Sequence, residues 1–188
     1  MRRYAVPVLR TILVANTWAL LLHLIVNVDV GNMTFGTPET LLACALLVIA
    51  PALIILPVAD KLAAPFFDAE AILGWSTLGF IIVFFRPAED VSYVQFLAFL
   101  LPLIAATASI MTLVAYAFVR RIRTRSPRAL NVMQARRIGY LAALTLVALA
   151  LLNALALLTP FNGTLVVAVA VLAELFVVAS RQPPLSAA

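Results

Sequence analysis

The sequence predicts an all-α, polytopic integral membrane protein with six transmembrane helices and cytoplasmic N- and C-termini. Three observations lead to this fold class. Hydrophobic residues make up 65% of the 188 residues and charged residues only 11%, against about 25% charged residues in an ordinary globular domain. The mean hydropathy is +1.12, so a soluble fold would have too little polar surface to cover itself. Apolar runs of membrane-spanning length recur along the chain, and basic residues gather in alternate connections between them.

The apolar runs predict a single membrane domain, residues 1–188, with six spans. A transmembrane helix needs about 20 mostly apolar residues, because each residue adds about 1.5 Å across roughly 30 Å of hydrocarbon. The expected spans are about 7–28, 38–59, 69–86, 90–119, 137–158 and 163–180. The first follows two arginines, as in a secretory signal peptide, but no small-residue cleavage site comes after it. We therefore expect it to be a retained span.

Helix-start and helix-stop residues set the limits of the next three spans. Thr37 and Pro38 are typical of a helix start, with a hydroxyl cap followed by proline in the first turn. The third span is expected after Asp68 and before Pro87. The fourth begins near Glu89, because carboxylates stabilise the N-terminal end of a helix.

The fifth span has a longer helical pattern than a bilayer requires. Ser126 and Pro127 repeat the hydroxyl-proline start, and the next proline is Pro160. A helix ending at Leu158 would be about 48 Å long, against roughly 30 Å of hydrocarbon. We therefore predict that 120–136 forms a basic cytoplasmic loop and helical stub. The sixth span is expected after the Asn-Gly pair at 162–163, and the tail 182–188 is expected to be disordered.

Basic residues in the short connections predict the orientation. With the N-terminus in the cytoplasm, the inner connections hold Arg2, Arg3, Lys61, the residues of 120–137 and Arg181. The outer connections then hold Arg86 as their single basic residue. This asymmetry predicts a multi-pass protein of the plasma (inner) membrane with both termini inside.

One basic cluster stands out in a chain of net charge +5. Its members are Arg120, Arg121, Arg123, Arg125, Arg128, Arg136 and Arg137. The cluster joins two spans and lacks an aromatic platform or a groove-reading motif, so we do not expect nucleic acid as a partner. Its expected roles are to fix orientation and to attract anionic lipid headgroups, with a protein partner as the alternative.

Amide and imidazole side chains inside spans form a first candidate site, because such groups are costly in hydrocarbon. Asn16, His23 and Asn27 follow one another at spacings of seven and four, which places them on one helix face. Asn153 of the fifth span is expected at a similar depth. The four side chains either line a polar pocket, or hydrogen-bond between helices and fix their packing. His23 is also a candidate ligand for a tetrapyrrole metal, which would need a partner for a two-histidine site.

Glu174 is the second candidate, as the one carboxylate well inside an expected span. Arg10 lies at a similar depth from the inner end of the first span, so an intramembrane Glu174–Arg10 ion pair is expected. Alternatively, Glu174 is a proton site for transport, or is held in its neutral form.

Helix-shaping residues occur within several spans. Pro51, Pro57 and Pro102 each remove a helical hydrogen bond and favour a kink. Small residues four apart, such as Gly139 and Ala143, allow neighbouring helices to approach closely.

The residues give no support for catalysis. The single histidine excludes a two-histidine zinc-protease motif, and the single cysteine, Cys44, excludes an intrachain disulfide. No cofactor is required by the sequence. We expect a non-catalytic accessory or scaffold subunit that assembles with other membrane protein subunits. The alternative is a small carrier or transport subunit that uses Glu174 and the polar pocket, with the two halves as an inverted repeat.

Overall fold

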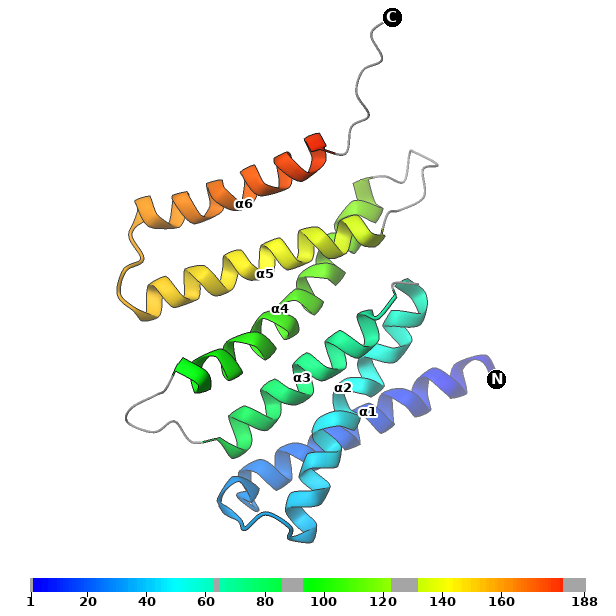
Figure 1. Cartoon of the computed structure of the whole chain (residues 1–188). Coiled ribbons are helices and arrows are strands. Elements are labelled where there is room, and N and C mark those ends of the chain that lie inside the picture. Colours follow the sequence, from blue (N-terminus) through cyan, green and yellow to red (C-terminus); the bar gives the residue numbers. More distant parts are fainter. Residues whose placement is uncertain (1, 63–64, 86–92, 123–131, 181–188) are drawn as a thin grey trace, which may run out of the picture. The chain divides into compact units, whose positions relative to one another are not determined.

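The computed structural model describes residues 2–62, 65–85, 93–122 and 132–180, with side chains from residue 8 onward, and these residues are helical apart from short connections. The elements are α1 (Arg2–Val26), the 3₁₀ turn η1 (Val30–Asn32), α2 (Pro38–Leu62), α3 (Phe67–Phe84), α4 (Tyr93–Ile122), α5 (Val132–Ala154) and α6 (Pro160–Ser180) (Figure 1). Within the described ranges, six helices are long and apolar enough to cross a membrane. The prediction of an all-helical chain with six helices able to span a membrane is confirmed for the described residues, and their insertion and the side on which the termini lie stay predictions.

The chain divides into two compact units, residues 1–106 and 107–188, with the division inside α4. In the first unit, α2 packs against both α1 and α3, and η1 contacts all three helices. The core of this unit is made by Leu21, Leu24, Val30, Ala43, Leu46, Leu47 and Ala50. Phe80 and Phe84 of α3 pack against it, and the ring of Phe35 lies 5.5 Å from that of Phe84. These contacts tie the α1–α2 connection to α3.

In the second unit, α5 packs against α6, and the C-terminal part of α4 closely approaches α5. The buried residues of α5 are Ala135, Gly139, Ala143 and Val147, spaced four apart on one face. A Cβ atom on Gly139 would lie only 2.6 Å from Thr112 Cα of α4. The predicted close approach at Gly139 is therefore confirmed. A similar approach in the first unit brings Gly74 of α3 against Ala105.

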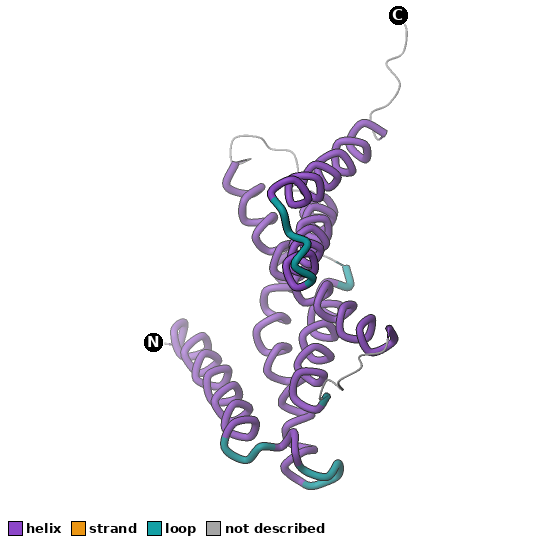
Figure 2. The backbone as a smooth tube through the Cα atoms, turned by 90° about the vertical axis from the view of Figure 1, so that its left-hand side faces the viewer, coloured by secondary structure: helices purple, strands orange, loops and turns teal. Residues whose placement is uncertain are grey.

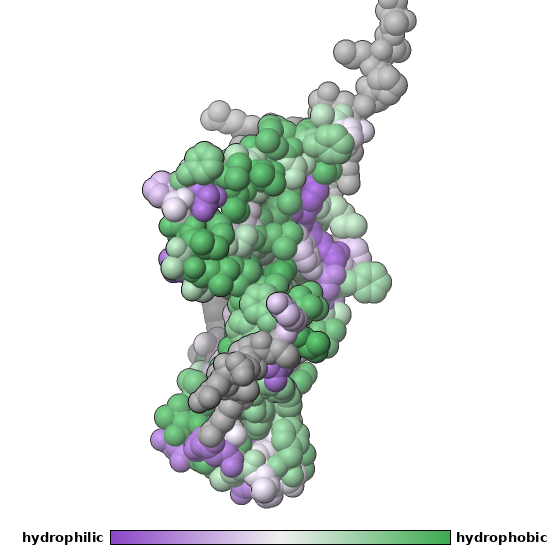
Figure 3. Space-filling view, turned by 60° about the vertical axis from the view of Figure 1, so that its left-hand side comes forward, coloured by the Kyte–Doolittle hydropathy of each residue, from purple (hydrophilic) through white to green (hydrophobic). Residues whose placement is uncertain are grey.

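Most of the surface is apolar, as expected for helices that contact lipid. Hydrophobic side chains cover much of the face drawn in Figure 3. Helix α6 has no buried residue at all, although it is a strongly apolar candidate span. Contacts within the described part of the chain therefore bury only some of the apolar surface of the helices.

Several helix limits differ from the prediction, most clearly around the last connection. The fifth helix ends at Ala154 rather than 158, and the sixth begins at Pro160 rather than 163. The reason is that Thr159 caps α6: its hydroxyl oxygen accepts the backbone N–H of Asn162 at 3.1 Å. Thr37 caps α2 in the same way, through the N–H of Thr40 at 3.3 Å. The hydroxyl-proline start recognised at the second span thus recurs at the sixth.

The other limits shift by a few residues. Helix α1 ends at Val26, α3 covers Phe67–Phe84 and α4 extends to Ile122. The predicted basic loop and stub at 120–136 is split, because its first residues belong to α4 and its last to α5. Its central part, 123–131, and the predicted disordered tail, 182–188, lie outside the described residues.

Candidate functional site

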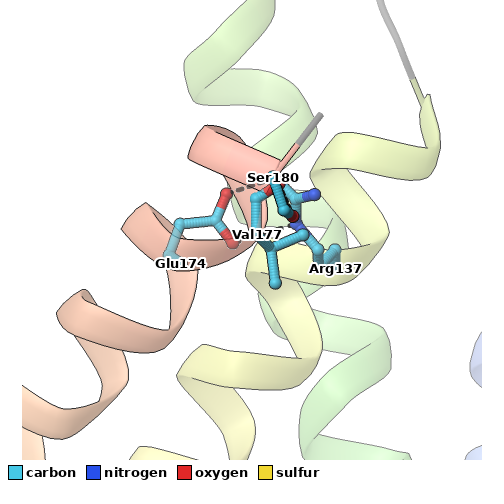
Figure 4. A network of polar contacts seen from close by, with 4 residues as sticks. All are labelled: Arg137, Glu174, Val177 and Ser180. Atoms are coloured by element: carbon cyan, nitrogen blue, oxygen red, sulfur yellow. Dashed lines mark hydrogen bonds and ion pairs between the residues drawn. The ribbon is translucent and has the colours of Figure 1, made fainter. Parts of the chain in front are cut away.

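An ion pair between neighbouring helices is the main polar contact of the second unit. Arg137 of α5 donates from Nε to Glu174 Oε2 at 2.9 Å and from Nη2 to Glu174 Oε1 at 2.5 Å. Figure 4 shows the carboxylate of α6 turned toward the guanidinium of α5. The two side chains are 21% and 24% exposed. Each carboxylate oxygen therefore has its own donor, the two-pronged geometry that suits arginine and carboxylate.

The hairpin of α5 and α6 positions this pair. The two helices run in opposite directions around a short connection, and Arg137 lies nearly as far before that connection as Glu174 lies after it. Asn162 stabilises the connection, because its Nδ2 donates to the carbonyl of Leu157 at 2.8 Å. Ser180, the last residue of α6, donates to the carbonyl of Val177 at 3.1 Å (Figure 4). Pairing is expected for charges at this depth, since an unpaired charge in hydrocarbon is expensive.

Within the second unit Glu174 is paired with Arg137, which the sequence assigns to a helical stub outside the membrane. The expected pair with Arg10, a residue of the first unit, stays a prediction. The register of the α5–α6 hairpin sets Arg137 beside Glu174. That register depends on where α5 ends and α6 begins, which differs from the predicted limits.

Arg10 has a different role within the first unit. Its Nη2 donates to the carbonyl oxygen of Leu53 in α2 at 3.3 Å. In a regular helix that carbonyl would accept the N–H four residues later, but the residue there is Pro57, which has none. Arg10 thus hydrogen-bonds a carbonyl that the proline leaves without its helical partner, and joins α1 to α2.

We expect the Arg10 contact to depend on Pro57. Arg10→Met should lower the free energy of unfolding by about 1 kcal/mol, the usual net contribution of one hydrogen bond. In a Pro57→Ala background, Leu53 regains its helical donor, so the same change should cost less than half as much. A double-mutant cycle measured by denaturation in lipid–detergent micelles checks this. Equal losses in the two backgrounds would contradict the proposed link between the arginine and the proline.

The stripe on α1 lies on the outside of its unit. Asn16, His23 and Asn27 are all exposed, and so is Asn153 near the end of α5. The structure places the α1 side chains on one outward face and not among buried residues. Within the stripe, Asn27 Nδ2 donates to His23 Nδ1 at 2.9 Å.

This hydrogen bond joins His23 to the next turn of the same helix. If Nδ1 of a neutral imidazole accepts it, the ring proton is on Nε2, which is then a donor. The role of His23 as a tetrapyrrole ligand stays a prediction. No group of three or more His, Cys, Asp or Glu side chains that suits a metal ion occurs among the described residues. The stripe can donate and accept hydrogen bonds sideways from α1.

The described members of the basic cluster lie at one end of the second unit. Arg120 and Arg121 lie in the last turn of α4 and are exposed. Arg136, in the early part of α5, has its guanidinium 6.0 Å from the ring centre of Tyr140. Arg137 is paired with Glu174. Arg123, Arg125 and Arg128 lie outside the described residues.

An open apolar groove lies between α5 and α6 near their connection. It is lined by Leu149, Leu158, Thr159, Pro160, Gly163, Thr164 and Val167. None of these side chains is ionisable, and Glu174 is not among them.

Comparisons with protein-family models, with curated proteins and with solved structures give no match to this chain.

Proposed function

We propose that this chain is a non-catalytic accessory or scaffold subunit of a multi-subunit membrane complex. Its place is the plasma (inner) membrane, with both termini in the cytoplasm. The observation that carries the proposal is the outward-facing stripe of Asn16, His23 and Asn27 on α1. Polar side chains in transmembrane helices almost always face other protein or a water-filled cavity.

A helix of another chain is the occupant that such a stripe favours. Lipid tails neither donate nor accept hydrogen bonds, so contact with them leaves amide and imidazole groups without partners. A neighbouring transmembrane helix supplies those partners and packs closely against small residues. Ala15 and Ala19 lie beside the stripe and leave room for such a helix.

Transport is the second candidate, and the Arg137–Glu174 pair is the observation in its favour. An ionisable pair in a membrane helix is a common feature of proton and ion pathways. The two-pronged geometry argues for a structural role, because a transport cycle would have to break both hydrogen bonds. The carrier reading loses its main support if reconstituted Glu174→Gln binds and transports as the parent chain does.

Anionic lipid is a further proposed partner, at the end of the second unit that bears the arginines. Arg120 and Arg121 are exposed in the last turn of α4, and each cation near an anionic surface contributes about 1 kcal/mol. We expect Arg120→Gln with Arg121→Gln to reduce the preference for anionic over neutral lipids by roughly fivefold per arginine. Competition between labelled lipids in reconstituted vesicles measures this preference. The effect should shrink at high salt, and an unchanged preference at low salt would contradict it.

The subunit proposal is tested by isolating the chain from its own membrane. A tagged copy expressed at its natural level is extracted with the surrounding lipid, without detergent exchange, and the particle is weighed and its chains identified. We expect a particle with further membrane protein chains in fixed ratio to this one. Recovery of a single 20.3 kDa chain with lipid alone would contradict the proposal.

A further inference from the structure

A regular seam of exposed side chains runs along α1 from residue 9 to Asn27, just past the end of the helix, and includes the polar stripe. Its residues are spaced alternately by four and three: Leu9, Leu13, Asn16, Leu20, His23 and Asn27. The three leucines are 70%, 52% and 42% exposed, in chain order, and the three polar residues are exposed as well. Alternating spacings of four and three are those of the contact positions in a left-handed pair of helices. We call these six residues the α1 seam.

The α1 seam lies beside the face that α1 packs within its own unit. The buried residues of α1 are Leu21 and Leu24. Leu21 lies about 100° around the helix from Leu20 and Leu24 about 40°, since each residue turns the helix by about 100°. Arg10, which reaches α2, follows the seam residue Leu9 and lies on the Leu21 side by the same count. Figure 2 shows α1, the helix beginning at the N mark, at the edge of its unit.

The polar groups of the α1 seam are complementary to copies of themselves. An asparagine amide has both a donor and an acceptor, so Asn16 can pair with another Asn16. The bond from Asn27 Nδ2 to His23 Nδ1 leaves Nε2–H of His23 as a donor and Oδ1 of Asn27 as an acceptor. In a parallel pair, the acceptor for Nε2–H of one His23 is therefore Oδ1 of the second copy's Asn27, about one turn along the helix.

We propose that the α1 seam binds the α1 seam of a second copy of this chain, as a parallel left-handed helix pair. All copies insert into the membrane in the same orientation, so a two-fold axis along the membrane normal brings equal seam positions to equal depth. The polar layers then meet polar layers and the leucine layers meet leucine layers. A foreign helix would have to present polar groups at the same depths and in the same order, whereas an identical helix does so by symmetry.

This inference rests on the proposed function, because it names the partner for the surface that carries it. The test is cysteine cross-linking of the full-length chain in lipid vesicles, at a low ratio of protein to lipid. The natural Cys44 is first replaced, as Cys44→Ser, so that the introduced cysteine is the only one that can form a disulfide. Leu20→Cys lies in the seam, and Leu22→Cys is the matched control, since Leu22 is similarly exposed at 54% but lies on a different face. We expect Leu20→Cys to form disulfide-linked pairs of this chain, and Leu22→Cys to form at least tenfold fewer.

A second variant separates a specific pair from random collision. Asn16→Leu, added to Leu20→Cys, keeps the seam apolar but removes its hydrogen bond. We expect it to lower the yield of cross-linked pairs several-fold at the same protein-to-lipid ratio. Equal cross-linking of Leu20→Cys and Leu22→Cys, or no cross-linking of Leu20→Cys, overturns the inference.

The native membrane distinguishes this inference from the proposed function. If Leu20→Cys is cross-linked there to a different protein, the second-copy inference fails while the subunit proposal stands. If the chain is recovered there alone and uncross-linked, both fail.

Discussion

Glu174→Gln alone should lower the free energy of unfolding by about 3 kcal/mol, because it leaves the Arg137 guanidinium without its counter-charge inside the membrane. Arg137→Gln should have a loss of similar size. The double variant should be more stable than either single one, since no unpaired charge remains. Denaturation of the three variants in lipid–detergent micelles, analysed as a double-mutant cycle, measures the coupling.

Arg10 is the matched control for this cycle. It is a second arginine near a helix end, but it contacts the carbonyl of Leu53 rather than Glu174. Arg10→Gln combined with Glu174→Gln should give losses that add within about 0.5 kcal/mol. Additive losses for Arg137 and Glu174, or coupling between Arg10 and Glu174, would refute the pairing described above.

Gly139→Ala should destabilise the second unit by about 2 kcal/mol, even though alanine is the better helix former. The added Cβ would lie 2.6 Å from both the N and Cα atoms of Thr112, where the neighbouring backbone cannot easily move. Overpacking of this kind costs about 1–3 kcal/mol, which outweighs the gain of about 1 kcal/mol in helix propensity. The free energy of unfolding in micelles measures the difference.

Gly163→Ala is the matched control and should have the opposite sign. At Gly163 of α6 the nearest atom to an added Cβ is Leu158 Cδ1 at 3.6 Å, an ordinary contact. Alanine there should be neutral or stabilising by up to about 1 kcal/mol. A loss at Gly163 equal to that at Gly139 would show that the α4–α5 approach is not the cause.

The number and type of the helices could be predicted because they depend on composition and run length alone. The limits near Pro160 depend on a local feature. Thr159 and Pro160 start α6, as Thr37 and Pro38 start α2. A hydroxyl residue before proline is the stronger sign of a start, because the side chain satisfies a backbone N–H that the helix leaves free.

Contacts between helices were harder to predict than the helices themselves. The spacing of Asn16, His23 and Asn27 establishes that they share a face, but not which way that face points. That direction follows from the packing of Leu21 and Leu24 against α2, which spacing alone does not give. The partner of Glu174 depended on hairpin register, and the contact of Arg10 on a carbonyl freed by Pro57.

The side chains of the outward stripe of α1 need hydrogen-bond partners from their surroundings. If lipid surrounds α1 on that side, Asn16 and Asn27 lose hydrogen-bond partners that water or protein would supply. If a protein helix lies there, the same side chains contribute about 0.6 kcal/mol per hydrogen bond to association. The proposed function therefore requires that protein cover the stripe.

Lipid accessibility of that stripe is the most direct measurement. Spin labels are placed one at a time through Asn16→Cys and, as control, Leu22→Cys, both in a Cys44→Ser background, in the natural membrane. Collision with oxygen, which concentrates in the hydrocarbon, reports contact with lipid. We expect the label at position 16 to be protected and the one at position 22 to be accessible. Equal and high accessibility at both positions would contradict a protein partner on α1.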